Sequence, residues 1–193
     1  MTVIFVSGLI GAGKSEFCAY LQQCGADVVS ADVLVAEMYE DADWCRSLEN
    51  ALGREFRKTN KQFDKAKLAQ TVFNSPELLE TLEQFIHPQV KALLQQRITQ
   101  STTSVFVYEI PILRTDTDLS LADVVVLVEA PRALRLERLI ARGMSSTDAT
   151  QRMLIQEQDS DRVSTADVIV ENAGTQNDLR TQAQMLFEKW STQ

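Results

Sequence analysis

The first residues of the chain carry a glycine-rich motif of the kind that binds phosphate groups. Residues 8–15 read Gly-Leu-Ile-Gly-Ala-Gly-Lys-Ser, the phosphate-binding loop pattern of two glycines separated by four residues and followed by Lys and Ser. In this pattern successive backbone N–H groups point at phosphate oxygens. Lys14 reaches the β- and γ-phosphates of a nucleoside triphosphate, and the Ser15 hydroxyl ligates Mg²⁺. The motif therefore predicts a nucleoside triphosphate site at residues 8–15.

Two carboxylates are candidates for the remaining chemistry of phosphoryl transfer. Asp32 comes at the end of the short strand pattern that begins at 27–30, and Glu109 ends the apolar run 104–109. Because parallel sheets hold their sites beyond the carboxyl ends of strands, Asp32 is positioned to orient or deprotonate an acceptor hydroxyl, and Glu109 to hold Mg²⁺, directly or through water. The alternatives are structural: Asp32 as the N-cap of the next helix, and Glu109 as a solvent-facing strand end.

Arginines in the second half of the chain could bind the nucleotide. Arg138 and Arg142 are one helical turn apart, so they share a face that suits adenine and phosphates; an ordinary charged helix surface would also explain them. Arg152 and Arg162 lie further along and could add positive charge when a lid closes.

The elements that must position these residues alternate between strand and helix. Short apolar runs at 3–6, 27–30, 104–109, 123–128 and 167–171 predict a parallel five-stranded sheet flanked by helices. Residues 33–103 contain only helical patterns and predict an insertion, and residues 142–165 predict a small helical lid. We expect residues 1–193 to form a single domain of this α/β type. A sheet with both additions is typical of phosphotransferases, which must exclude water from the transferred group.

Composition narrows the classes of function. The formal net charge of −8 argues against binding to nucleic acid or to an anionic membrane. Three cysteines without metal-ligand spacing indicate reduced thiols. No apolar run approaches the length of a membrane span, and a strand pattern at the start leaves no room for a signal peptide. We therefore expect a cytoplasmic enzyme that acts on a small molecule, as a monomer or a weak homo-oligomer.

The chain resembles the dephospho-CoA kinase family over nearly its whole length. The segments that carry the resemblance, in chain order, are 7–15, Gly25, Ala31-Asp32, Phe85-Ile86-His87-Pro88, Ile110-Pro111-Ile112-Leu113, 136–142, Gln156, 166–169, Asn172 and Gly174. The resemblance implies transfer of the ATP γ-phosphate to the 3′-hydroxyl of dephospho-coenzyme A, the last step of CoA synthesis, with Mg²⁺ as cofactor. It implies that Asp32 is the general base, that 33–103 binds the acceptor and that 142–165 is the lid. It also implies that the ATP phosphates bind to Gly11, Ala12, Gly13, Lys14, Ser15 and Glu16.

This sequence departs from the family pattern at several positions in or near these segments. They are Leu9, Glu16, Ser30, Ala36, Glu109 and Arg114. The family has an arginine at the position of Ala36, where it would anchor charge. A nucleotide or nucleoside kinase and a non-catalytic nucleotide-binding relative therefore remain alternatives. A GTP-binding switch is less favoured, because Asn60-Lys61-Gln62-Phe63 lacks the Asp of a guanine-binding motif.

Overall fold

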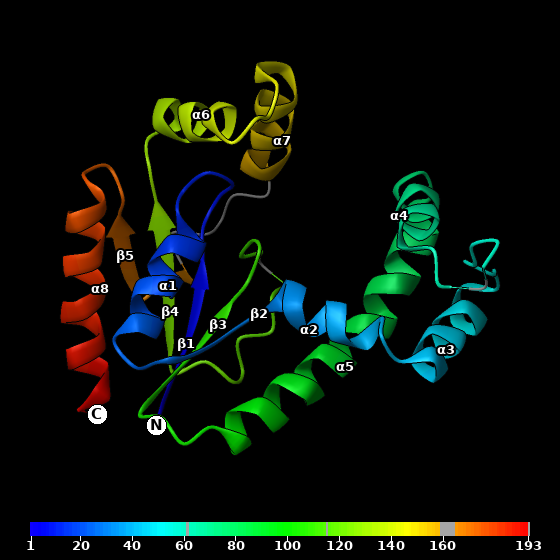
Figure 1. Cartoon of the computed structure of the whole chain (residues 1–193), viewed down its shortest axis with the longest axis horizontal. Helices are drawn as coiled ribbons and strands as arrows, with labels where there is room; N and C mark the ends of the chain where they lie inside the picture. The colour runs from blue at the N-terminus through cyan, green and yellow to red at the C-terminus, as the bar shows by residue number, and fades with distance from the viewer. Residues whose placement is uncertain (61, 115, 159–164, 193) are drawn as a thin grey trace. The chain divides into compact units, whose positions relative to one another are not determined.

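The central feature of the chain is the predicted parallel sheet. Figure 1 shows the computed structural model, which describes residues 1–60, 62–114, 116–158 and 165–192. Its strands pair only in parallel, in the order β2-β3-β1-β4-β5. Their bounds are β1 Thr2–Ser7, β2 Asp27–Ser30, β3 Val105–Glu109, β4 Val124–Glu129 and β5 Val168–Glu171. The predicted sheet is confirmed, with strand ends within one or two residues of those expected.

One face of the sheet is covered by α1 (Lys14–Gln23) and α8 (Gln176–Ser191), as Figure 1 shows. Alternate strand residues, among them Val126 and Val128, join the core that these helices complete, and Trp190 of α8 is almost fully buried there. Because side chains alternate between the two faces of a strand, Leu127 and Glu129 point to the opposite face.

Two helices lie beyond the carboxyl ends of the strands, α6 (Arg132–Ala141) and α7 (Ser146–Gln158) (Figure 1). They pack on each other through Leu139, Ala149 and Met153, which are buried. The described part of the predicted lid is thus mainly α7. Residues 159–164, which include Arg162, lie outside the described residues.

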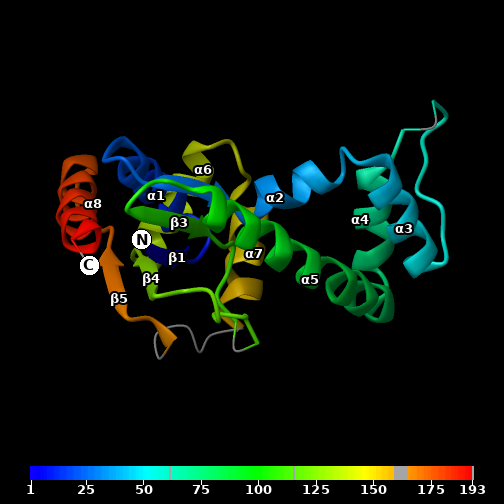
Figure 2. The ribbon, with the colours of Figure 1, turned by 90° about the horizontal axis from the view of Figure 1, so that it is seen from below.

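The chain divides into two compact units, residues 1–31 with 100–193, and residues 32–99. The second unit contains α3 (Ala42–Leu52), α4 (Lys65–Phe73) and most of α2 (Ala31–Met38) and α5 (Pro76–Gln100). Figure 2 shows α3, α4 and the first part of α5 side by side. Their own core is formed by Leu48, Leu52, Phe56, Leu68 and Val72. None of the described helices combines the length and apolar character needed to cross a membrane.

Helix α5 runs through His87-Pro88 without interruption. Proline lacks an N–H, so the carbonyl one turn earlier loses its helical donor. Next to this point, Gln89 donates through Nε2 to the Phe85 carbonyl oxygen at 2.7 Å. Its Oε1 accepts a 2.6 Å hydrogen bond from Nε1 of Trp44 on α3. Gln89 thus links α5 to α3 where the proline weakens the helix.

Candidate active site

The glycine-rich loop joins β1 to α1 and has the backbone that its sequence requires. Gly11 and Gly13 adopt φ angles of 79° and 101°, which favour glycine. A Cβ atom at Gly13 would lie 2.2 Å from Nδ2 of Asn172, and one at Gly11 would lie 2.8 Å from the Arg135 carbonyl oxygen. Within the described residues no side chain caps the start of α1. The N-terminal end of a helix carries a partial positive charge, which attracts an anion.

Two residues far along the chain hold the loop in this shape. Asn172, at the end of β5, is buried and donates through Nδ2 to the Ala12 carbonyl oxygen at 2.8 Å. Arg138 on α6 donates through Nη1 to the carbonyl oxygens of Gly11 and Ala12, at 3.4 and 3.3 Å. Its Nη2 atom donates to the carbonyl oxygen and Oδ1 of Asn172, at 3.1 and 3.2 Å. These donors bind the carbonyl oxygens of Gly11 and Ala12 and so fix the backbone of the loop.

The loop also contacts α7. Oε1 of Gln156 accepts a 2.7 Å hydrogen bond from the backbone N–H of Ile10. The sequence identified Gln156 and Asn172 only as markers of resemblance and gave neither a role. The positions of both depend on pairing between distant segments, which local spacing does not report.

The two predicted metal ligands lie together. Ser15 Oγ, at the start of α1, donates to Glu109 Oε1, at the end of β3, at 2.7 Å. Ser30, where the family has an acidic residue, pairs in register with Glu109 on the neighbouring strand. A hydroxyl and a carboxylate are the hard oxygen donors that suit Mg²⁺, which also keeps several waters and phosphate oxygens as ligands. The described residues contain no group of three or more His, Cys, Asp or Glu side chains that could hold a metal by themselves.

Glu16, where the family has a hydroxyl, is held by contacts on the α1 and α8 surface. Its Oε1 accepts a 3.1 Å hydrogen bond from the Tyr20 hydroxyl, one turn further along α1. The guanidinium carbon of Arg180, on α8, lies 5.1 Å from the centre of the Tyr20 ring. Burial, together with the hydrogen bond to Glu16, raises the pKa of Tyr20. The tyrosine therefore stays protonated as a donor.

The other predicted residues are placed as follows. Asp32 is exposed in the first turn of α2 and belongs to the unit 32–99. Arg142 is exposed and directly follows α6, whereas Arg138 contacts the loop itself. Arg152 is exposed on α7. Lys14, the first residue of α1, is half-buried.

The site and fold together define a class of protein. A parallel sheet in this strand order, with a phosphate-binding loop after its central strand and an oxygen-ligand pair beside it, is that of a P-loop kinase. The family model described as dephospho-CoA kinase matches residues 2–178. The chain belongs to the dephospho-CoA kinase family.

Similar proteins agree with this assignment along the whole chain. A dephospho-CoA kinase of Corynebacterium diphtheriae is 30% identical, with the alignment covering 100% of this chain and 99% of that protein. A solved structure from Thermus thermophilus, TT1252, has a TM-score of 0.81 at 30% identity and covers 97% of each chain. The dephospho-CoA kinase structure from Campylobacter jejuni has a TM-score of 0.73 at 26% identity, covering 98% of this chain and 97% of that one.

Proposed function

We propose that this protein transfers the γ-phosphoryl group of ATP to the 3′-hydroxyl of dephospho-CoA and so forms coenzyme A. The bond between the γ-phosphorus and the β,γ-bridging oxygen breaks, a new bond to the 3′-oxygen forms, and ADP leaves. The observation that carries the proposal is the family match over residues 2–178, and the hydrogen bond between Ser15 and Glu109 beside the glycine-rich loop supports it.

The residues of the loop bind and neutralise the triphosphate. The N–H groups at the start of α1 would bind phosphate oxygens, and Lys14 would supply a positive charge at the β- and γ-phosphates. Ser15 and Glu109 would hold Mg²⁺, which when bound offsets charge on the phosphate oxygens. Asp32 would accept the proton that the 3′-hydroxyl loses. Arg142 would bind the nucleotide, and Arg138 would keep the loop in place beneath it.

The acceptor would bind to the helical insertion 33–103, and residues 142–165 would form the lid. The unit 32–99 carries an aromatic cluster in which Tyr39 lies 5.1 Å from Trp44 and 5.3 Å from Phe63, measured between ring centres. Two cations border it: Lys65 Nζ lies 4.9 Å from the centre of the Tyr39 ring, and the Arg57 guanidinium carbon 5.9 Å from that of Phe63. Aromatic faces bordered by cations suit a base and phosphate groups.

The test is turnover of dephospho-CoA with ATP and Mg²⁺, run beside a panel of nucleosides and nucleotides as acceptors. We expect product only with dephospho-CoA. Lys14→Ala should nearly abolish turnover of dephospho-CoA, and Asp32→Asn should lower kcat by about 10²-fold or more. Asp43→Asn removes an exposed carboxylate of the same unit and serves as the control, with wild-type turnover expected.

Three results would contradict parts of the proposal. Faster turnover of a nucleoside or nucleotide would make this chain a kinase of a different acceptor. Tight ATP binding without any product would favour a non-catalytic role. Unchanged kcat in Asp32→Asn would exclude that residue as the base.

A further inference from the structure

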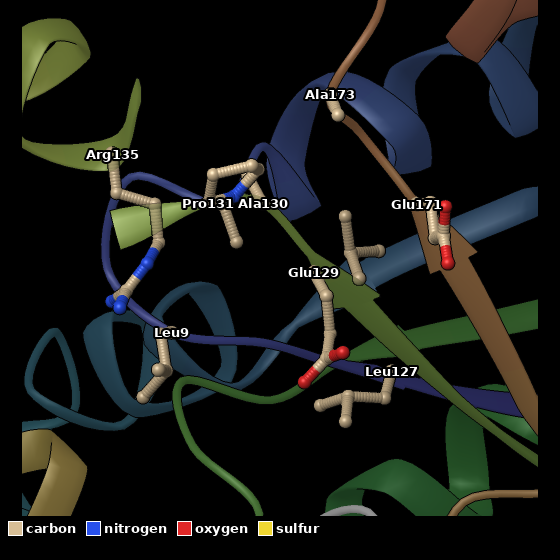
Figure 3. A pocket seen from close by; sticks show the side chains of 10 residues that line it. Leu9, Leu127, Glu129, Ala130, Pro131, Arg135, Glu171 and Ala173 are labelled. Atoms are coloured by element: carbon tan, nitrogen blue, oxygen red, sulfur yellow. The ribbon is translucent and has the colours of Figure 1, made fainter. Parts of the chain in front are cut away.

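A pocket opens at the carboxyl ends of β4 and β5, on the sheet face opposite α1 and α8. It has a volume of about 400 Å³, in the range of small-molecule sites. Figure 3 shows the side chains around it. Apolar residues form most of its wall, namely Leu9, Ala12, Leu127, Val128, Ala130, Pro131 and Ala173, and its charged residues are Glu129, Arg135 and Glu171. No part of the proposed phosphotransfer uses these three charged side chains.

Arg135 brings a buried positive charge with unused donors into this pocket. Its residue is only 5% exposed, and its Nη2 donates to Oε1 of Glu157 on α7 at 2.6 Å. Nε and Nη1 are buried and have no hydrogen-bond partner in the part of the chain that the structure describes. Burying N–H groups of a cation without acceptors is unfavourable, so an acceptor in the pocket would be bound firmly. Arg132 contacts Glu157 as well, at 3.4 Å, which leaves this end of the pocket net positive.

The other end of the pocket carries two neighbouring negative charges. Glu129 and Glu171 are the last residues of β4 and β5 and pair in register, so their side chains leave the sheet on the same face. Both residues are exposed. In Figure 3 the guanidinium group of Arg135 lies on the side of Leu9, whereas the two carboxylates lie across the pocket from it. Adjacent like charges repel, and a bound cation would relieve this.

We propose that this pocket binds a small zwitterion, an amino acid whose carboxylate meets Arg135 and whose ammonium group meets Glu129 and Glu171. The apolar wall between the two ends fits a hydrocarbon spacer, so ω-amino acids match it best. Leu9 and Ala12 belong to the phosphate-binding loop. The ligand would therefore contact the loop directly and could alter nucleotide binding as an effector.

The experiment is a titration of the ¹⁵N-labelled full chain, without nucleotide, followed through the amide resonances of Leu9, Ala12 and Ala173. The probes are γ-aminobutanoate, δ-aminopentanoate and ε-aminohexanoate, and the matched controls are butanoate and butylamine. We expect saturable shifts for at least one zwitterion, with a Kd at least about 10-fold below those of both controls. No shifts with any zwitterion would overturn the proposal, and so would equal binding of butanoate, which would reveal an anion site only.

Variants separate the two ends of the pocket. Arg135→Met should raise the Kd of the zwitterion at least about 10-fold, and Arg135→Lys should recover part of the lost affinity. The double variant Glu129→Gln/Glu171→Gln changes two exposed residues. It should raise the Kd of the zwitterion to a similar extent and leave the Kd of butanoate unchanged. Lys189→Met removes an exposed charge of α8 and should bind as wild type does. If Arg135→Met does not fold, the glutamate double variant decides: unchanged binding there rejects the proposal. Because no ATP is present, the result is independent of kinase activity.

Discussion

The Ser15 hydroxyl donates a 2.7 Å hydrogen bond to Oε1 of Glu109, a residue 94 positions later in the chain. Pairing of β1 with β3 creates this contact, because Glu109 lies in register with Val6, just before the loop begins. The hydroxyl that starts α1 and the carboxylate that ends β3 therefore share one edge of the sheet. This arrangement suits a magnesium ion that arrives with a triphosphate.

Replacing Glu109 by Gln should impair use of Mg²⁺. The amide keeps the size of the side chain and can still accept from Ser15, but it removes the negative charge. We expect the half-saturating Mg²⁺ concentration to rise about 10- to 100-fold, the range for loss of a residue that supports metal binding. Steady-state rates measured over a Mg²⁺ series test this.

Glu188→Gln on α8 is the control for that series, because this carboxylate is exposed and accepts a hydrogen bond from Gln184 of the same helix. It should show the wild-type Mg²⁺ dependence. An unchanged Mg²⁺ dependence in Glu109→Gln would mean that the carboxylate only orients Ser15.

Removing the Asn172 amide should loosen the phosphate-binding loop. Asn172→Ala deletes the donor to Ala12 and an acceptor of Arg138. We expect the KM for ATP to rise about 10-fold and the free energy of unfolding to fall by about 1–3 kcal/mol, since the Ala12 carbonyl loses one of its two side-chain donors. Urea denaturation and ATP titration measure the two effects. The control is Asn177→Ala on the exposed surface of α8, which should change neither the KM for ATP nor the free energy of unfolding. If Asn172→Ala lowers stability but leaves the KM for ATP unchanged, the residue has only a structural role.

How much of this follows from the sequence depends on the range of each interaction. The strands are continuous apolar runs, so their places and parallel pairing could be predicted. The meeting of Ser15 with Glu109 could be predicted too, because both follow strands at one edge of the sheet. The contacts of Arg138 with the loop could not, since they require the packing of α6 on a segment more than a hundred residues earlier. Arg135 was missed for the same reason: its burial depends on α6, α7 and the loop together.

Glu157 should make stability depend on pH in the acid range. Partial burial acts to raise its pKa, but hydrogen bonds and charge from Arg135 and Arg132 outweigh this, so the pKa of Glu157 is lowered. A carboxylate with a lowered pKa stabilises the fold above its unfolded-state pKa, and that contribution disappears as pH falls through the folded-state value. Glu157→Gln should therefore be less stable than wild type at about pH 7, with a smaller difference at about pH 3. Urea denaturation of both proteins at the two pH values measures this, and a gap of equal size at each would contradict it.

The carboxylate of Glu16 should weaken ATP binding. It lies in the first turn of α1, the end of the helix that would bind the phosphates, and a negative charge there repels them. Glu16→Thr and Glu16→Gln both remove the charge, and only Thr adds the hydroxyl that the family has. We expect the KM for ATP to fall about 3- to 10-fold in both variants, with a larger fall for Thr if its hydroxyl binds phosphate. The measurement is an ATP titration at low ionic strength, repeated at high salt, where screening should shrink the difference. A higher KM in both variants would instead mean that the Glu16–Tyr20 contact supports the start of the helix, and that its loss outweighs the removed repulsion.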